Sequence, residues 1–165
     1  MTWGIHSILY RDIGEEEKAA HYFRIGFNVF AYPPFYTWHE GNHTDGMGGG
    51  APNLVTGAGG FLQSVWAGYG GVRFERAGEL TLRQPAPLPD STLLRLRGVH
   101  FLGARLDITA HTDGWSVGLS AASPSGALAL VVAAEGGGAV AELTKGANVR
   151  FRKGVTAHVR EKSGR

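Results

Sequence analysis

The first part of the chain carries hydrophobic side chains at helical spacing. Three segments show this pattern: residues 2–12, 15–31 and 54–69. In the second segment the apolar positions recur every three or four residues, as one face of an α-helix requires; they are Ala20, Phe23, Phe27 and Phe30. Pro33-Pro34 stops that helix from continuing, and Gly70-Gly71 ends the third. The pattern therefore predicts three helices.

After Gly71 the hydrophobic period shortens to two, which is typical of β-strands. Nine short segments alternate or run apolar: 72–76, 79–83, 93–97, 104–110, 115–121, 127–134, 140–144, 148–152 and 155–160. Glycine and proline turn signals separate them, which favours an antiparallel sandwich or barrel. The order predicts an α+β chain, with helices in residues 1–71 and a β-domain in residues 72–163.

Composition and charge exclude several classes of protein. The 165 residues suffice for one ordinary domain or little more. The net charge of +2 is spread without a basic run, which argues against a nucleic-acid partner. The absence of cysteine excludes a disulfide scaffold, a cysteine nucleophile and a thiolate metal site. No apolar stretch approaches the ~18 residues of a membrane span, so we expect no membrane association.

The connection over residues 32–56 is long, which is typical of functional loops. It carries Trp38 and further aromatic residues, together with Glu40, Asp45 and two histidines. Aromatic rings beside polar groups are typical of a sugar site, because rings cover the apolar faces of pyranosides. The alternative is a loop whose aromatic residues anchor it to a neighbouring core. The residues alone leave both interpretations open.

His39, Glu40 and His43 match the H-E-x-x-H zinc motif. That motif requires a helix, which places both histidines on one face. Prolines precede it, Gly41 lies inside it and several glycines follow, so helix propensity is poor. A third ligand at a suitable distance is missing. We therefore interpret the match as accidental and expect neither a metal nor another cofactor.

The segment Thr56–Gln63, with the sequence TGAGGFLQ, begins the third predicted helix. It lacks the last glycine of a dinucleotide fingerprint and the lysine of a P-loop, so it is a very weak nucleotide motif. Amides at the start of a helix attract anionic or strongly polar ligand atoms, which is one interpretation of Thr56 and Gly57. The other is close packing of small residues, and the two remain open.

The string from Pro34 to Arg73 resembles the C-terminal end of the catalytic domain in glycoside hydrolase family 65. The resemblance is carried by these elements: Trp38, Glu40, the glycines of 46–50, Thr56–Gln63 and Gly68–Arg73. It implies an (α/α)6 barrel followed by an antiparallel C-terminal β-sandwich. Residues 1–71 would then hold the last helices and the active-site loop of a truncated barrel, and residues 72–163 the sandwich.

The resemblance also implies the chemistry. Family members are inverting hydrolases and phosphorylases, and inversion by a hydrolase needs one carboxylic acid and one carboxylate base. By position, Glu40 matches the general base and favours hydrolysis, because a carboxylate would repel the phosphate of a phosphorylase. The general acid lies upstream in the family, and nothing in residues 1–32 matches it. We therefore expect the 165-residue chain alone to be inactive.

The implied substrate is an α-glucoside, with the glucosyl-galactosyl-hydroxylysine of collagen favoured and trehalose second. The expected substrate-binding residues are Trp38, His39, Thr56 and Gly57, and the expected location is cytoplasmic, because such relatives lack a secretion signal. The alternative function is a stand-alone, non-catalytic carbohydrate-binding β-sandwich module. A further expectation concerns stability: without a complete barrel, the aromatic stripe with Phe23, Phe27 and Phe30 should be exposed to solvent.

Overall fold

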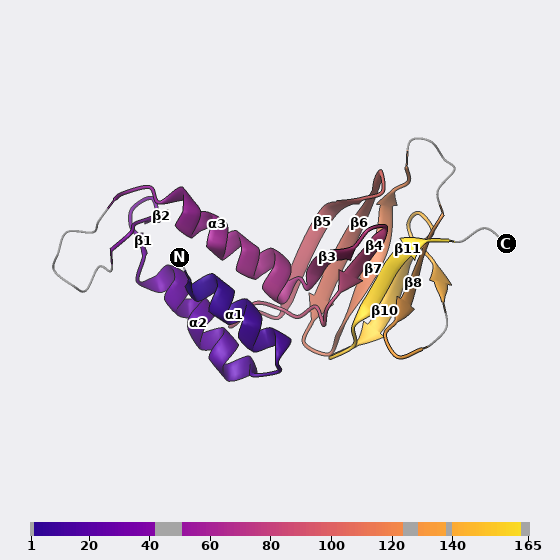
Figure 1. Ribbon diagram of the computed structural model, residues 1–165, viewed down its shortest axis with the longest axis horizontal. Helices are drawn as coiled ribbons and strands as arrows, with labels where there is room; N and C mark the ends of the chain where they lie inside the picture. The colour runs from indigo at the N-terminus through magenta and orange to yellow at the C-terminus, as the bar shows by residue number, and fades with distance from the viewer. Residues whose placement is uncertain (1, 42–50, 124–128, 138–139, 163–165) are drawn as a thin grey trace. The chain divides into compact units, whose positions relative to one another are not determined.

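The computed structural model describes residues 2–41, 51–123, 129–137 and 140–162. The chain divides into two compact units, Met1–Gly68 and Tyr69–Arg165 (Figure 1). Helices dominate the first unit and antiparallel sheets make up the second. The α+β class predicted from the two hydrophobic periods is therefore confirmed.

The helices of the first unit lie where the apolar spacing predicts them. They are α1 (Trp3–Asp12), α2 (Glu16–Asn28) and α3 (Val55–Gln63), and α3 continues as a π-helical segment, Ser64–Tyr69. A short turn with Gly14 at a φ of 79° joins α1 to α2, which suits glycine because this φ strains other residues. The Ser7 hydroxyl donates to the Ala19 carbonyl at 2.8 Å and ties the two helices together.

Glycine allows α1 and α3 to approach closely. A Cβ atom at Gly4 would overlap the carbonyl oxygen of Gly60 on α3. The two helices therefore touch through backbone rather than through large side chains, and only glycine fits at this contact.

The loop after α2 contains a short hairpin that the sequence pattern does not predict. Strands β1 (Ala31–Tyr32) and β2 (Thr37–Trp38) pair antiparallel around a turn with a cis peptide bond between Pro33 and Pro34. Two-residue strands are too short to show a period, so the pattern could not reveal them. Residues 42–50, which include His43, Asp45 and the glycines of 46–50, lie outside the described residues.

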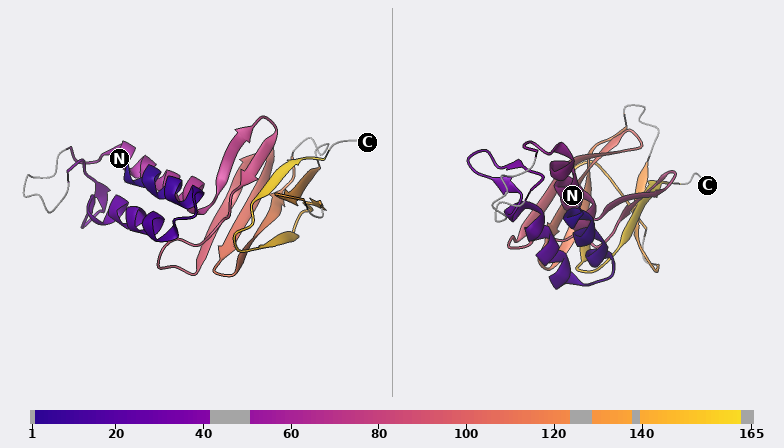
Figure 2. Two further views of the ribbon diagram at one scale, coloured as in Figure 1. Left: turned by 60° about the horizontal axis from the view of Figure 1, so that its bottom comes forward. Right: turned by 60° about the vertical axis from the view of Figure 1, so that its left-hand side comes forward.

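The second unit contains a strand in each of the nine predicted segments. The strands are β3 (Val72–Arg76), β4 (Glu79–Leu82), β5 (Leu93–Phe101), β6 (Ala104–His111), β7 (Gly114–Ala121), β8 (Leu130–Ala134), β9 (Ala141–Glu142), β10 (Asn148–Arg152) and β11 (Ala157–Glu161). They form a four-stranded sheet, β10-β7-β6-β5, and a five-stranded sheet, β3-β4-β11-β8-β9 (Figure 2).

One face of each sheet is buried. Leu106, Ile108 and Val117 are at most 1% exposed on the four-stranded sheet, as are Leu80 and Val159 on the other. The two sheets lie one over the other as two layers (Figures 1 and 2), with these buried faces between them. This arrangement is an antiparallel sandwich, which the turn spacing predicts.

The expected exposure of the aromatic stripe is wrong for its central residue. Phe23 is only 5% exposed, because its ring packs against Phe27 and, at 5.4 Å between ring centroids, against Phe61 of α3. Exposed apolar residues are found instead on α1 and its C-cap, at helical spacing: Ile5, Leu9 and Ile13.

Candidate functional site

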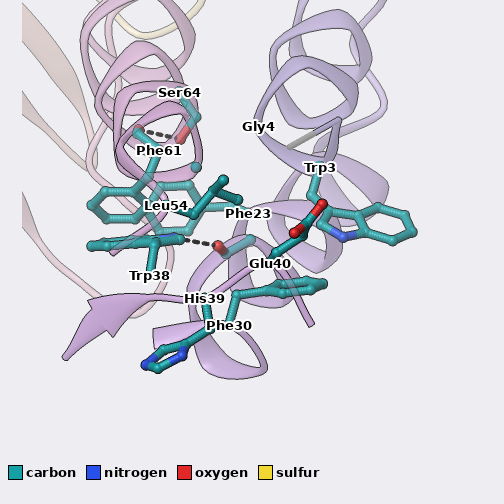
Figure 3. A pocket seen from close by; sticks show the side chains of 12 residues that line it. Trp3, Gly4, Phe23, Phe30, Trp38, His39, Glu40, Leu54, Phe61 and Ser64 are labelled. Atoms are coloured by element: carbon teal, nitrogen blue, oxygen red, sulfur yellow. Dashed lines mark hydrogen bonds between the residues drawn. The ribbon is translucent and has the colours of Figure 1, made fainter. Parts of the chain in front are cut away.

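A pocket in the first unit collects residues from all three helices and from the loop after α2 (Figure 3). Its lining residues are Trp3, Gly4, Phe23, Gly26, Phe30, Trp38, His39, Glu40, Leu54, Gly57, Phe61 and Ser64. Its volume is about 20 Å³. A cavity of this size holds about one water molecule, not a sugar ring.

Trp38 forms one wall of the pocket and is held from three sides. Its indole N–H donates to the carbonyl of Gly26 at 3.0 Å, and its ring lies 5.1 Å from that of Phe61. Its backbone carbonyl accepts from the amide of Leu54 at 2.6 Å, just before α3. The ring is therefore pre-positioned as a rigid wall that needs no further ordering when a ligand binds.

Glu40 is the one carboxylate that lines the pocket among the described residues. It is exposed, and its backbone amide donates to the carbonyl of Ala51 at 3.2 Å. In Figure 3 its carboxylate extends to the side of the pocket formed by Trp3. The pocket thus combines a cavity for about one water molecule with one carboxylate in its lining.

His39 contributes to the pocket differently from its neighbours. Its ring nitrogen Nε2 lies 3.3 Å from the Thr37 hydroxyl, and its imidazole points away from the cavity in Figure 3. His39 and Glu40 are not helical, so the described part of the H-E-x-x-H match lacks the geometry that a zinc helix supplies. Among the described residues no group of three or more potential ligands could hold a metal ion.

The other two sequence-predicted residues lie in the first turn of α3. Thr56 is exposed and does not line the pocket, whereas Gly57 is buried there. A Cβ atom at Gly57 would lie 3.1 Å from Cδ1 of Trp38 and 3.3 Å from Cδ2 of Leu54. The absence of a side chain thus lets the helix start lie against the Trp38 ring. The structure therefore brings Trp38, His39, Glu40 and Gly57 together, and leaves Thr56 outside.

Sequence reasoning missed most of the pocket wall. Trp3 begins α1, Gly26 lies near the end of α2 and Phe61 lies on α3. Two of these residues gave a signal. Trp3 is a tryptophan at the start of a helix, and Gly26 is a glycine within a helix, where alanine would stabilise the helix by about 1 kcal/mol more. Neither signal shows which residues meet in space.

The remaining described carboxylates of this unit lie at the other end of the helix pair. Asp12 ends α1, Glu15 is the N-cap of α2, and Glu16 and Glu17 lie in its first turn. Since Trp3 at the pocket begins α1, these groups are separated from it by the length of a ten-residue helix, about 15 Å at 1.5 Å per residue. Glu16 and Glu15 also form ion pairs, with Arg11 at 2.8 Å and Lys18 at 3.1 Å.

None of the helices formed by the described residues combines the length and the apolar character that a bilayer span requires.

Comparison with known proteins relates the chain to glycosidases. Protein-glucosylgalactosylhydroxylysine glucosidase of Danio rerio is 34% identical over 152 residues, which cover 92% of this chain and 22% of that protein. Its namesake in Dictyostelium discoideum is 31% identical over 116 residues, 70% of this chain and 15% of that protein. Kojibiose hydrolase of Flavobacterium johnsoniae is 37% identical over 78 residues, 47% of this chain and 11% of that protein.

No family model matches the chain, and no solved structure matches it. The chain spans about a fifth of the length of the Danio rerio glucosidase and less of the other two relatives. The relatives and the motifs between Trp38 and Arg73 both indicate a glycoside hydrolase of family 65. The chain is thus a partial match to the glycoside hydrolases of family 65 and resembles protein-glucosylgalactosylhydroxylysine glucosidase.

Proposed function

We propose that this chain is part of an inverting glycoside hydrolase that releases glucose from α-glucosides, with Glu40 as its general base. The observation that carries the proposal is the placement of the Glu40 carboxylate at a pocket of about 20 Å³. In an inverting hydrolase the base removes a proton from the water that attacks the anomeric carbon, and that water needs a defined position. The rigid Trp38 wall and the Glu40 carboxylate together supply one.

The general acid comes from outside the described residues of the first unit. In inverting enzymes the two carboxyl groups lie about 6.5–9.5 Å apart. The carboxylates at the α1–α2 turn are about 15 Å of helix away from the pocket, and two of them are engaged in ion pairs. The acid and the room for the sugar therefore belong to further helices of an (α/α)6 barrel, of which α1, α2 and α3 are a part.

The exposed apolar side of the first unit supports this assignment. Ile5 and Leu9 of α1 and its C-cap Ile13 are 48%, 56% and 70% exposed, and Val55 and Leu62 of α3 are 79% and 64% exposed. Helices usually bury such stripes against another element. Neighbouring barrel helices would cover them.

The favoured substrate is the glucosyl-galactosyl-hydroxylysine of collagen, because the relative that covers 92% of this chain is named for it. Kojibiose replaces trehalose as the second candidate, because relatives that cover about half of the chain are named kojibiose hydrolase.

The test is a fusion that supplies the rest of the Danio rerio relative to this chain. Glucose release from glucosyl-galactosyl-hydroxylysine, kojibiose and trehalose is measured for the fusion and for its Glu40→Gln variant. We expect kcat to fall at least ~10²-fold in the variant, the low end for a general base, with the substrate dissociation constant nearly unchanged. NMR should show β-glucose as the first product, because the configuration inverts.

Glu17→Gln is the matched control, since it makes the same chemical change at an exposed carboxylate far from the pocket; it should leave kcat unchanged. A Glu40→Gln variant with full activity would remove Glu40 from the mechanism. α-Glucose as the first product would show that the enzyme retains the anomeric configuration and would contradict the proposed inverting mechanism. The 165-residue chain without the fusion partner should release no glucose, because Glu40 is the one carboxylate among the described residues that lines the pocket and it cannot act as both acid and base.

A further inference from the structure

The outer face of the four-stranded sheet carries a groove of about 640 Å³ in the second unit. Its lining residues are Arg95, Thr109, His111, Asp113, Gly114, Trp115, Ser116, Asn148, Arg150, Phe151 and Arg152. Such a volume lies within the range that binds ligands of a few hundred daltons. The groove belongs to the sandwich alone and is independent of Glu40.

Strand register explains the shape of this groove. Arg95 of β5 pairs with Thr109 of β6, Thr109 with Ser116 of β7, and Ser116 with Arg150 of β10. Residues directly opposite one another share a face of the sheet. The row therefore places short hydroxyl side chains in the middle and a long arginine on each edge strand, about 14 Å apart at three strand spacings. We call this feature the arginine trough.

The trough is positively charged. Arg152 lies two residues from Arg150 on β10 and so faces the same side. Among the described residues that line the trough, three arginines compare with a single carboxylate, Asp113. The arginines at 95, 150 and 152 are exposed. Asp107 on β6 is a nearby carboxylate. It accepts a hydrogen bond from the Gly98 amide at 2.8 Å and so stabilises the bulge in β5.

The chemistry of the trough disfavours two kinds of ligand. Neutral sugars usually lie on an open aromatic ring, but Trp115 is 2% exposed and stacks on Phe151 at 4.3 Å between centroids. Extended peptides are usually held by main-chain pairing at a sheet edge, whereas in this row the backbone of β6 and β7 already pairs on both sides. Recognition in the trough must come from side chains.

We infer that the arginine trough binds an anionic oligosaccharide, one that carries sulfate or carboxylate groups. The guanidinium groups would pair with the anionic substituents. The hydroxyls of Thr109 and Ser116 and the amide of Asn148 would exchange hydrogen bonds with the sugar hydroxyls. The sandwich would then hold the protein on an acidic glycan while the chemistry takes place in the other unit.

The test is a binding titration of the full chain with a sulfated octasaccharide prepared from heparin. Calorimetry at low salt measures the affinity. Arg95→Gln and Arg150→Gln should each weaken binding about tenfold or more, as expected for loss of a charge-assisted hydrogen bond. Arg160→Gln on β11, an exposed arginine of the other sheet, is the matched control and should change the affinity less than twofold. Added salt should weaken binding.

Amide NMR shifts of the unmodified chain provide a readout that needs no variant: they should change along β5, β6, β7 and β10. A neutral glucose octamer and a poly-glutamate peptide complete the titration and should bind at least tenfold more weakly. Equal affinity for the neutral octamer, tighter binding of poly-glutamate, shifts confined to other strands, or unchanged affinity in both arginine variants would each overturn the inference. Loss of Glu40 should leave this binding intact, so the outcome is separable from that of the proposed function.

Discussion

The two units of the chain differ in how completely they bury their own hydrophobic residues. Of the 21 hydrophobic residues that are buried among the described ones, 19 lie in the second unit and only Ala19 and Phe23 in the first. Conversely, of the eleven large hydrophobic residues that are exposed in the described part of the chain, seven lie in the first unit, although it is the shorter of the two. The sandwich closes its own core, whereas the helices that carry the candidate site leave apolar surface uncovered.

This difference is what we expect if further helices cover the helical unit, as the proposed function requires. Its internal contacts are aromatic ring pairs and glycine backbones, such as Phe23 against Phe61 and Gly4 against Gly60. These contacts set the geometry of the pocket but enclose little area, and free energy from hydrophobic burial grows with the apolar area removed from water.

The strongest test of this comparison separates the units. Residues 69–165 expressed alone should unfold in one cooperative transition, with a stability in the ordinary range of about 5–15 kcal/mol. Residues 1–68 alone should lack such a transition and should bind a hydrophobic dye. Thermal melting by circular dichroism and dye fluorescence measure both. A cooperative, dye-free helical unit would mean that its own packing suffices.

The next largest effect on the unfolding free energy is expected from truncation of one core residue. Leu106 is 0% exposed in the sandwich, so Leu106→Ala should cost about 2–5 kcal/mol of unfolding free energy, from lost transfer energy and the cavity left behind. The same truncation at Leu9, which is 56% exposed in the helical unit, should cost less than about 0.5 kcal/mol. Urea unfolding measures both. Similar losses at the two positions would contradict the contrast.

Glycine packing tests the helical unit itself. Gly4→Ala should destabilise that unit by about 1–3 kcal/mol, because the added Cβ would collide with the rigid backbone of α3. Gly59→Ala on α3 is the matched control: no atom lies within 4 Å of its added Cβ, so better helix propensity should stabilise by up to about 1 kcal/mol. Hydrogen exchange of α1 amides reports the change. A harmless Gly4→Ala would mean that α1 and α3 do not meet as closely as the structure has them.

The smallest expected effect is the loss of unfolding free energy when each of two ion pairs loses its carboxylate. Arg11 is 5% exposed at its side chain, donates to the Gly68 carbonyl at 3.1 Å and pairs with Glu16 at 2.8 Å. Glu16→Gln should therefore cost about 1–2 kcal/mol, because the buried guanidinium loses a charged hydrogen-bond partner, whose own side chain is 57% exposed. Glu75 and Arg83 are 42% and 38% exposed at their side chains, so Glu75→Gln should cost less than about 1 kcal/mol. Chemical denaturation of both variants measures the difference, and a larger loss at Glu75 would reverse the expected order.

Local sequence determined most of the secondary structure. The helical spacing in residues 15–31 and the alternation in 104–110 correspond to α2 and β6 within a few residues, because the period of burial follows from backbone geometry alone. Motifs also drew attention to Trp38, Glu40 and Gly57, all of which line the pocket. The β1–β2 hairpin was missed, since two-residue strands have no period.

Only the tertiary structure decided which residues meet. Trp3, Gly26 and Phe61 come from three helices and line one pocket with Trp38. No local period encodes contacts between segments so far apart in the chain. The arginine trough has the same origin: Arg95 and Arg150 share a face because of the strand order β10-β7-β6-β5 and its register. A shift of one residue in that register would have turned these side chains to the opposite face.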